Sequence, residues 1–430
     1  MKIAVLVLFI LLSVTLIVCN IFLPRLKLKK IQLQTFWIVS LIFAIVTLCL
    51  GVISWNDISN SFFSDVAVNP LKIIVLFFSM TLISVFLDEI GFFSFIAYKC
   101  SLVFKKNQYT LFFGLYLIIS ILTVFTSNDI IILTFTPFIC FLCKRSNLKP
   151  VVYLFMEFVA ANTWSLCLII GNPTNIYIAS SFNIAFFDYF IKMIIPTLAA
   201  SITSLLIMFV IFFKFLKEPI SMTLDEVKKP NTLLLVVGLV HLISATILLA
   251  VSSYINWPMW IIAGCFALSL LIFVLIYSLV SKSNYVFPLM KRIPWSLLPF
   301  VLSMFIIVLA LVNTGWSQDI INMLHGTNLT AYSYGLSGGV SANLINNIPM
   351  SVLYTTLLNS SEQSAMYASI AASNIAAYIT PLGSLAGIMF VGLVNKHDIK
   401  FSFLDFTKYG LVIGLPTLVM CITVIQFLHF

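Results

Sequence analysis

The chain has 430 residues, of which 61% are hydrophobic and 9% are charged. A water-soluble protein of this length carries far more charged surface, so the composition excludes a soluble globular protein. The formal net charge of +9 is therefore interpreted as membrane topology, because Lys and Arg collect in cytoplasmic loops. No nucleic-acid partner is expected.

Apolar runs of about twenty residues recur from end to end and predict about ten membrane-spanning helices in a lipid bilayer. Two more apolar stretches, 109–143 and 331–358, do not behave as single spans. We expect each of these two to be a re-entrant hairpin, which enters and leaves the membrane on the same side. In chain order, the predicted spans are residues 3–23, 34–53, 71–95, 150–187, 193–213, 232–253, 257–280, 295–312, 365–394 and 409–428.

The first of these stretches is too long for one crossing of about 20 residues, and its middle reads TSND from Thr126 to Asp129. A single crossing would place one of its two basic flanks outside. A hairpin keeps both flanks in the cytoplasm, with its polar tip buried in protein. The basic residues of the two flanks are Lys99, Lys105, Lys106, Lys144, Arg145 and Lys149.

The distribution of charge favours one orientation in the cell membrane, with the N-terminus and the C-terminus both outside. In this orientation all but three of the 23 Lys and Arg residues face the cytoplasm, and the three outside are Lys2, Lys72 and Lys192. The second hairpin has no basic neighbour. It is flanked outside by Asp319, His325 and Glu362.

The two halves of the chain repeat the same order of features with opposite orientation. Residues 1–218 form the first predicted repeat, residues 219–231 a cytoplasmic linker, and residues 232–430 the second repeat. The predicted fold is an all-α polytopic membrane protein with two inverted repeats. Each repeat contains a re-entrant hairpin and an interrupted transmembrane helix, as is typical of many secondary transporters.

A local alignment supports this pairing of the halves. Residues 161–172 align without gaps on residues 373–384, which places Asn162 on Asn374 and Gly171 on Gly383. Chance similarity between two apolar helices would match Leu and Ile, whereas matches at polar, helix-breaking positions indicate a repeat.

Polar, helix-breaking residues inside apolar segments predict a binding site for a solute or an ion. Pro removes a backbone donor and Gly tolerates unusual backbone angles, so each break frees backbone groups that protein, water or a ligand must satisfy. One break alone is equally well explained as a packing kink, but four breaks in repeat-related positions favour a site. The predicted binding residues are Ser127, Asn128, Asp129, Asn162, Gly171, Asn172, Pro173, Thr174, Asn175, Asn346, Asn347, Asn374, Thr380, Pro381, Gly383 and Ser384.

Carboxylates inside the apolar segments are candidates for coupling transport to H+ or Na+, because charge within a membrane is costly and usually functional. Asp129 lies at the first hairpin tip and is the leading candidate. Asp88 and Glu89 lie near the cytoplasmic end of the third span, where a second interpretation is that they position the helix. Glu157 lies early in an interrupted span, and the pattern assigns it no role.

Other classes of protein find little support in the sequence. The chain contains no H-E-x-x-H, no G-x-S-x-G and no nucleotide-binding loop, so no enzyme, cofactor or metal site is expected. A channel is an alternative to a carrier. Solute flux driven by an ion gradient separates the two.

Three segments resemble the arsenite/antimonite efflux permeases of the ion-transporter superfamily, which also holds sodium/proton antiporters and di- and tricarboxylate carriers. They are LDEIGFF (Leu87–Phe93), SNDIIILTFTP (Ser127–Pro137) and ITPLGSLA (Ile379–Ala386). The resemblance covers essentially the whole chain. It implies proton-driven export of trivalent arsenic or antimony hydroxides, assisted in some members by a soluble ATPase subunit. A homodimer is a further partner to consider.

The first interrupted helix departs from this family pattern. Typical arsenite permeases have an acidic residue near the position of Asn162, and a serine-asparagine-leucine-valine-asparagine run where this chain has GNPTN (171–175). The glycine-asparagine-proline form resembles other branches of the superfamily. An H+- or Na+-coupled carrier of another inorganic or carboxylate anion is therefore the alternative function.

Overall fold

The computed structural model describes residues 1–430 except 24, 29–30, 64–68, 105, 221–226, 253, 325–328, 360–361, 398, 400 and 429–430. The described part is almost entirely helical, and its one β-element is a two-stranded hairpin. Some sequence-based predictions fall outside the described residues: the cations Lys29, Lys30, Lys105 and Lys400, the flanking His325, and part of the linker 219–231.

The first half of the chain contains ten helices, one β-hairpin and one 3-10 turn in its described part. In order they are α1 (Lys2–Phe22), β1 (Arg25–Leu28), β2 (Ile31–Gln34), α2 (Thr35–Cys49), α3 (Trp55–Phe63), α4 (Pro70–Glu89), α5 (Phe92–Phe104), α6 (Gln108–Phe125), α7 (Asn128–Arg145), α8 (Pro150–Trp164), η1 (Ile169–Gly171), α9 (Pro173–Ser181) and α10 (Phe186–Leu216).

The described part of the second half contains a further ten helices and a 3-10 turn. They are α11 (Thr232–Ala250), α12 (Met259–Val280), α13 (Val286–Arg292), α14 (Leu297–Asn313), α15 (Trp316–Leu324), α16 (Thr330–Ile345), α17 (Asn347–Leu357), α18 (Gln363–Ile375), η2 (Ala376–Tyr378), α19 (Leu385–Lys396) and α20 (Phe403–Phe427).

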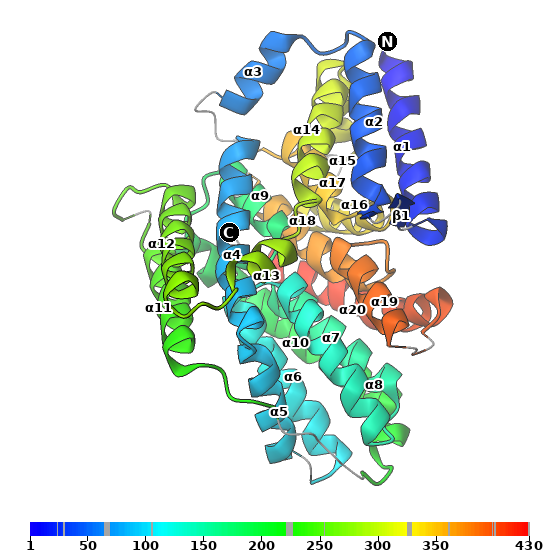
Figure 1. Ribbon diagram of the computed structural model, residues 1–430. Coiled ribbons are helices and arrows are strands. Elements are labelled where there is room, and N and C mark those ends of the chain that lie inside the picture. The colour runs from blue at the N-terminus through cyan, green and yellow to red at the C-terminus, as the bar shows by residue number, and fades with distance from the viewer. Residues whose placement is uncertain are drawn as a thin grey trace.

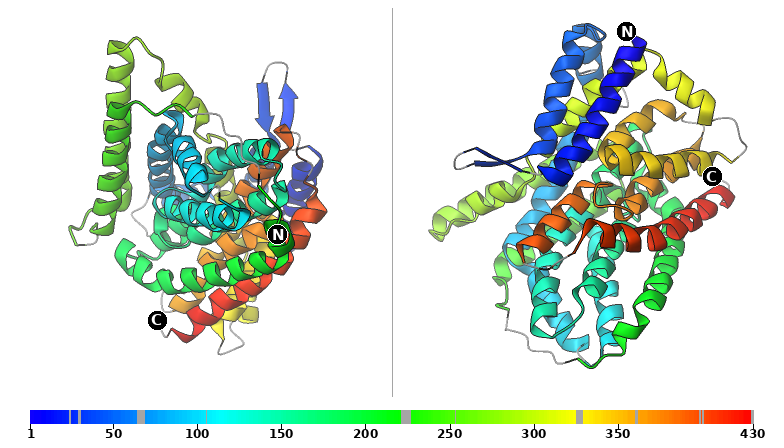
Figure 2. Two further views of the ribbon diagram at one scale, coloured as in Figure 1. Left: turned by 90° about the horizontal axis from the view of Figure 1, so that it is seen from below. Right: turned by 90° about the vertical axis from the view of Figure 1, so that its right-hand side faces the viewer.

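The helices confirm an all-α polytopic membrane protein. Seven described segments are long and apolar enough to cross a membrane: α4, α6, α10, α11, α12, residues 286–313 and α20. Shorter apolar helices, such as α2 and α19, accompany them. Exposed Leu, Ile and Val side chains cover the outward faces of α11 and α12, which stand as a green pair at the edge of the molecule beside α4 (Figures 1 and 2).

Helices α6 and α7 form a helical hairpin. That it is re-entrant stays a prediction, because α6 is itself long and apolar enough to cross a membrane. At one end, the Tyr153 hydroxyl near the start of α8 donates to Gln108 Oε1 at the start of α6, at 3.1 Å. At the other end, Asn128 at the start of α7 donates to Asn162 near the end of α8, at 3.0 Å. Because α7 ends just before α8 begins, the α6 start and the α7 end lie at the same end of α8.

Helices α16 and α17 form a second hairpin. The Tyr334 hydroxyl, near the start of α16, donates to the Leu357 carbonyl at the end of α17, at 2.9 Å. The chain reverses at Asn346, whose φ of 76° and ψ of 153° lie in a region that is normally reserved for glycine. Such strain persists where surrounding contacts hold it, and the Asn346 amide is held by the Leu382 carbonyl at 3.1 Å.

Two helix pairs, α8–α9 and α18–α19, are interrupted where the sequence places Gly and Pro. A Cβ on Gly171 would lie 2.2 Å from the Ser165 carbonyl oxygen, so only glycine allows this close approach. Asn172 caps α9, with Pro173 in its first turn, and Ser384 caps α19 by accepting from Gly387 N at 3.0 Å.

The hairpins and interrupted helices follow one another in the same order in both halves, and each half ends with a long helix, α10 or α20. The inverted relation of the halves and the division at residues 219–231 stay predictions. Figure 1 shows α9, α17 and α18 near the centre, between a group containing α1, α2 and α14 and a group containing α5, α6, α7 and α8. The breaks therefore lie in the interior of the molecule.

Candidate functional site

Asn374 of α18 is the centre of a polar network that joins the two interrupted helix pairs. Its Oδ1 accepts hydrogen bonds from Ser165 Oγ at 2.7 Å and from Asn172 Nδ2 at 2.8 Å. Its Nδ2 donates to Asn175 Oδ1 at 2.6 Å. All four residues are buried, so both ends of the Asn374 amide are engaged by the first break.

The tip of the first hairpin reaches the same region through Asn162. Asn128 Nδ2 donates to Asn162 Oδ1 at 3.0 Å, and Asn162 Nδ2 donates to the Phe158 carbonyl at 2.8 Å. One further bond crosses between the halves, because the Thr174 and Ser373 hydroxyls lie 2.9 Å apart. Ser127 caps α7 through its hydroxyl, which fixes the direction in which this helix begins.

The tip of the second hairpin bonds to the second break. Asn347 N donates to the Gly383 carbonyl at 3.0 Å, and Asn347 Nδ2 donates to the Ser373 carbonyl at 3.1 Å. The buried Asn347 Oδ1 has no hydrogen-bond partner among the described residues. A buried acceptor of this kind is costly unless something binds to it, so it is available to a hydroxyl or ammonium group of a solute.

Asn343 of α16 holds Thr380 of the second break, and Asn343 was missed from the sequence. Its Oδ1 accepts from Thr380 N at 3.0 Å and from Thr380 Oγ1 at 2.7 Å. The Pro381 carbonyl packs tightly on Gly387: a Cβ added to Gly387 would lie 2.5 Å from the Pro381 carbonyl oxygen. Ser165 and Ser373 were also missed, because an isolated serine in an apolar helix carries no distinctive signal.

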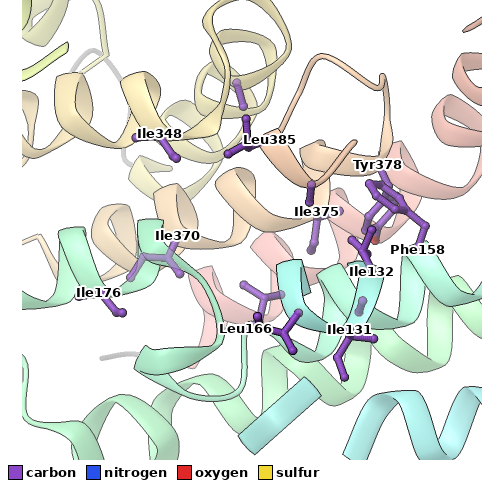
Figure 3. Close-up of a cluster of buried hydrophobic side chains, with 14 of the residues drawn as sticks. Ile131, Ile132, Phe158, Leu166, Ile176, Ile348, Ile370, Ile375, Tyr378 and Leu385 are labelled. Atoms are coloured by element: carbon purple, nitrogen blue, oxygen red, sulfur yellow. The ribbon is translucent and has the colours of Figure 1, made fainter. Parts of the chain in front are cut away.

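Apolar side chains enclose the polar network. Figure 3 shows that they come from both hairpins and both interrupted pairs, including Leu166, Ile176, Ile348 and Ile370. All four are buried. In apolar surroundings a hydrogen bond is strong, and a polar group left without a partner costs free energy. The site therefore favours solutes that match its donors and acceptors.

Two small cavities adjoin the network, and larger ones lie beyond them. One, of about 30 Å³, is lined by Pro173, Thr174 and Tyr177, among others. The second, of about 10 Å³, is lined by Ser127 and Asp129 and shares Phe77 and Leu297 with the first. None of the side chains that line these two cavities is basic.

The wider cavities lie towards the two predicted membrane faces. One of about 520 Å³ is lined by the start of α4 and by the α9–α10 and α11–α12 connections, all of which are predicted to lie outside. Another, of about 320 Å³, is lined by α5, α7 and His397, on the predicted cytoplasmic side. The two cavities beside the network are much smaller than these two.

The three candidate coupling residues occupy different environments. Asp129 lines the smaller cavity, and its carboxylate has no hydrogen bond or ion pair with any described residue. Asp88 and Glu89, at the end of α4, lie outside the network and form ion pairs with Arg292, with Glu89 Oε2 at 3.0 Å from Arg292 Nη1. Thr134 of α7 also donates to Asp88 Oδ1, at 2.6 Å.

Comparisons with known proteins agree with this architecture. The sequence model of a protein family described as citrate transporter matches residues 31–371. A putative arsenical pump membrane protein of Bacillus subtilis is 23% identical over 423 residues, which cover 89% of this chain and 92% of the relative. An arsenical pump membrane protein of Escherichia coli K12 is 26% identical over 365 residues, covering 80% and 83%. An uncharacterized transporter of Mycobacterium tuberculosis is 24% identical over 395 residues, covering 87% and 89%.

These similarities confirm the resemblance to arsenical pump proteins that the sequence motifs indicate. The family and the relatives are membrane transporters and not enzymes, so the chain is a membrane transporter of a small solute. With most of its length matched by the family model, this chain belongs to the citrate transporter family.

Proposed function

We propose that this transporter is a secondary active carrier of the cell membrane that exports arsenite or antimonite, as neutral trivalent hydroxides, in exchange for protons. The observation that carries the proposal is the composition of the site. The Asn374 network consists of amides, hydroxyls and backbone groups, and the adjoining cavities have no basic lining residue.

This composition favours a neutral, hydroxylated solute over an anion of high charge. Amides and hydroxyls both donate and accept, so they match the O–H groups of a trihydroxide. A tricarboxylate needs cationic partners when it leaves water, because burying unpaired charge is very costly. The names of the Bacillus subtilis and Escherichia coli relatives point in the same direction.

The proposed mechanism is alternating access around the two hairpins. We assign the solute to the two cavities beside the Asn374 network, which are lined by Thr174 and by Asp129. The unpartnered Asn347 Oδ1 at the second hairpin tip is a further proposed acceptor. Asp129 is the proposed coupling residue because it lines a cavity and lacks a cationic partner, whereas Asp88 and Glu89 are paired with Arg292. Each hairpin would then carry one part of the site, as in inverted-repeat transporters.

The second candidate function is an H+- or Na+-coupled carrier of another inorganic or carboxylate anion. The description of the family as citrate transporter favours it. An oxygen-rich tip with Asp129 is also compatible with Na+ in place of H+, since hard cations prefer oxygen ligands.

Arsenite resistance tests the proposal. Cells that lack their own arsenic exporters should grow at higher arsenite concentrations when they express this chain. Cells with the Asn374→Ala variant at the same membrane level should not. Unchanged sensitivity at normal membrane expression would contradict arsenite export, and gradient-driven citrate uptake by the same cells would support the second candidate.

A further inference from the structure

Glu157 is a buried carboxyl group that the proposed mechanism does not use. It lies in the middle of α8 with 0% of its surface exposed. Its Oε1 accepts a hydrogen bond from Thr136 Oγ1 of α7 at 2.9 Å. Its Oε2 is buried without a hydrogen-bond partner among the described residues.

The surroundings of Glu157 contain no described cation. The titratable side chains that interact with it are Cys140 and Cys143, which also lie on α7. The other elements that contact α8 are α6, α10, α18, α19, α20 and η2, and no described titratable group of these elements interacts with Glu157. An ionised carboxylate cannot be buried here without a large penalty, whereas a protonated one is tolerated.

Helix α7 has a proline and a neighbouring cavity at this contact. Pro137 follows Thr136 directly and removes a backbone donor, so the helix is weakened at this turn. The opposite side of the same turn borders the cavity of about 320 Å³, which is lined by Thr134, Pro137 and Phe138. The cavity provides space into which α7 can shift when its contact with α8 is lost.

We propose that Glu157 is a proton-binding residue that holds α7 against α8 in its neutral form, and that loss of its proton releases the first hairpin. Ionised Glu157 needs water, and water reaches it when α7 moves away from α8. Since α7 begins at Asn128, which bonds to Asn162, this movement changes the solute site. Its consequence for transport rests on the proposed function, but the movement itself does not.

Cys140, one of the two native cysteines of α7, provides a direct readout of the movement. In a full-length variant that retains Cys140 alone, we would measure alkylation by a membrane-permeant maleimide in vesicles between about pH 6 and about pH 9. The reference is the same protein with Glu157→Gln, which stays neutral. We divide the alkylation rate of the protein with native Glu157 by that of the Glu157→Gln protein. This ratio removes the intrinsic effect of pH on the thiol.

The ratio should be near one at acidic pH and should rise several-fold at alkaline pH. A flat or falling ratio would overturn the proposal. A falling ratio is also what charge alone would give without movement, because a carboxylate repels a nearby thiolate. Glu218→Gln, which changes an exposed carboxylate, is the matched control and should follow the protein with native Glu157.

Amide hydrogen exchange of the unmodified protein gives a second test that depends on no variant. After correction for intrinsic chemistry, exchange in α7 should accelerate at alkaline pH relative to α11, which carries no carboxylate. Equal acceleration in the two helices would contradict the proposal. Neither experiment requires a substrate, so a failure of arsenite transport is distinguishable from a failure of this inference.

Discussion

Asn172 donates a hydrogen bond from its Nδ2 to Asn374 Oδ1 at 2.8 Å, and this bond joins the break of the first half to that of the second. The two residues are separated by about half of the chain. Because Asn374 also bonds to Ser165 and Asn175, one amide side chain fixes the relative position of both interrupted helix pairs.

Asn374→Ala should therefore abolish transport and lower stability. The substitution leaves buried partners unsatisfied, each at a cost of about 1–3 kcal/mol. Thermal unfolding in detergent and solute uptake check the two effects. Asn322→Ala, at an exposed position that accepts one bond from Gln318, is the matched control and should behave as the unmodified protein. Normal uptake by Asn374→Ala would remove Asn374 from the site.

Gly171→Ala tests whether the first break requires the close approach of two backbone segments. The new Cβ would lie 2.2 Å from the Ser165 carbonyl oxygen, so the backbone must shift, at a cost of about 1–3 kcal/mol or more. Gly264→Ala is the control, because its Cβ would meet no atom nearer than Val75 Cγ1 at 3.7 Å. The Gly264→Ala substitution should be tolerated or should stabilise α12 slightly. Equal thermal stability of the two variants would contradict the described geometry of the break.

Cysteine labelling tests which side of the membrane each loop faces. In a background without reactive cysteines, Lys106→Cys and Lys144→Cys should both be labelled from the cytoplasm by an impermeant reagent, because the α6–α7 hairpin returns both ends to one side. Ser317→Cys, at the start of α15, should be labelled from outside. A second outside position, Ser361, lies beyond the described residues. Labelling of 106 and 144 from opposite sides would exclude a re-entrant first hairpin.

Asp129→Asn should uncouple transport from the proton gradient. The amide keeps the shape of the side chain but cannot exchange a proton, so accumulation driven by the gradient should fall to background. Downhill exchange of solute should persist, because binding and coupling are separable free energies. Uptake into inverted vesicles with and without a pH gradient measures both.

Asp88→Asn is the comparison for this experiment. It changes a carboxylate that is already paired with Arg292 at the end of α4, so its effect on coupling should be milder. If Asp129→Asn responded to the gradient as the unmodified protein does, the coupling role would pass to Asp88 or Glu89.

The sequence was most informative where a residue acts on its own backbone. Pro173, Gly171 and the hairpin-tip residues interrupt helices through local sterics, so their positions were predicted without a structure. The predicted span 71–95 shows the limit of this reasoning. Helix α4 ends at Glu89 because Gly91 adopts a φ of 85°, a turn that a span drawn from average hydropathy runs across.

Contacts between distant segments could not be predicted. The ion pairs of Arg292 with Asp88 and Glu89 cross between the halves, and the contact of Asn343 with Thr380 depends on how α16 packs on the second break. Glu157 accepts a hydrogen bond from Thr136 because α7 packs on α8. Each of these pairings depends on packing, which a single sequence does not encode in any local pattern.

Accumulation of arsenite by the purified, reconstituted protein tests proton-coupled export most directly. Liposomes with an acidic interior should accumulate arsenite above its external concentration, since outward proton flow drives inward solute flow. A protonophore should abolish the accumulation, and citrate should neither replace arsenite nor compete with it. Arsenite entry that is indifferent to the pH gradient, or gradient-driven accumulation of citrate alone, would contradict the proposed function.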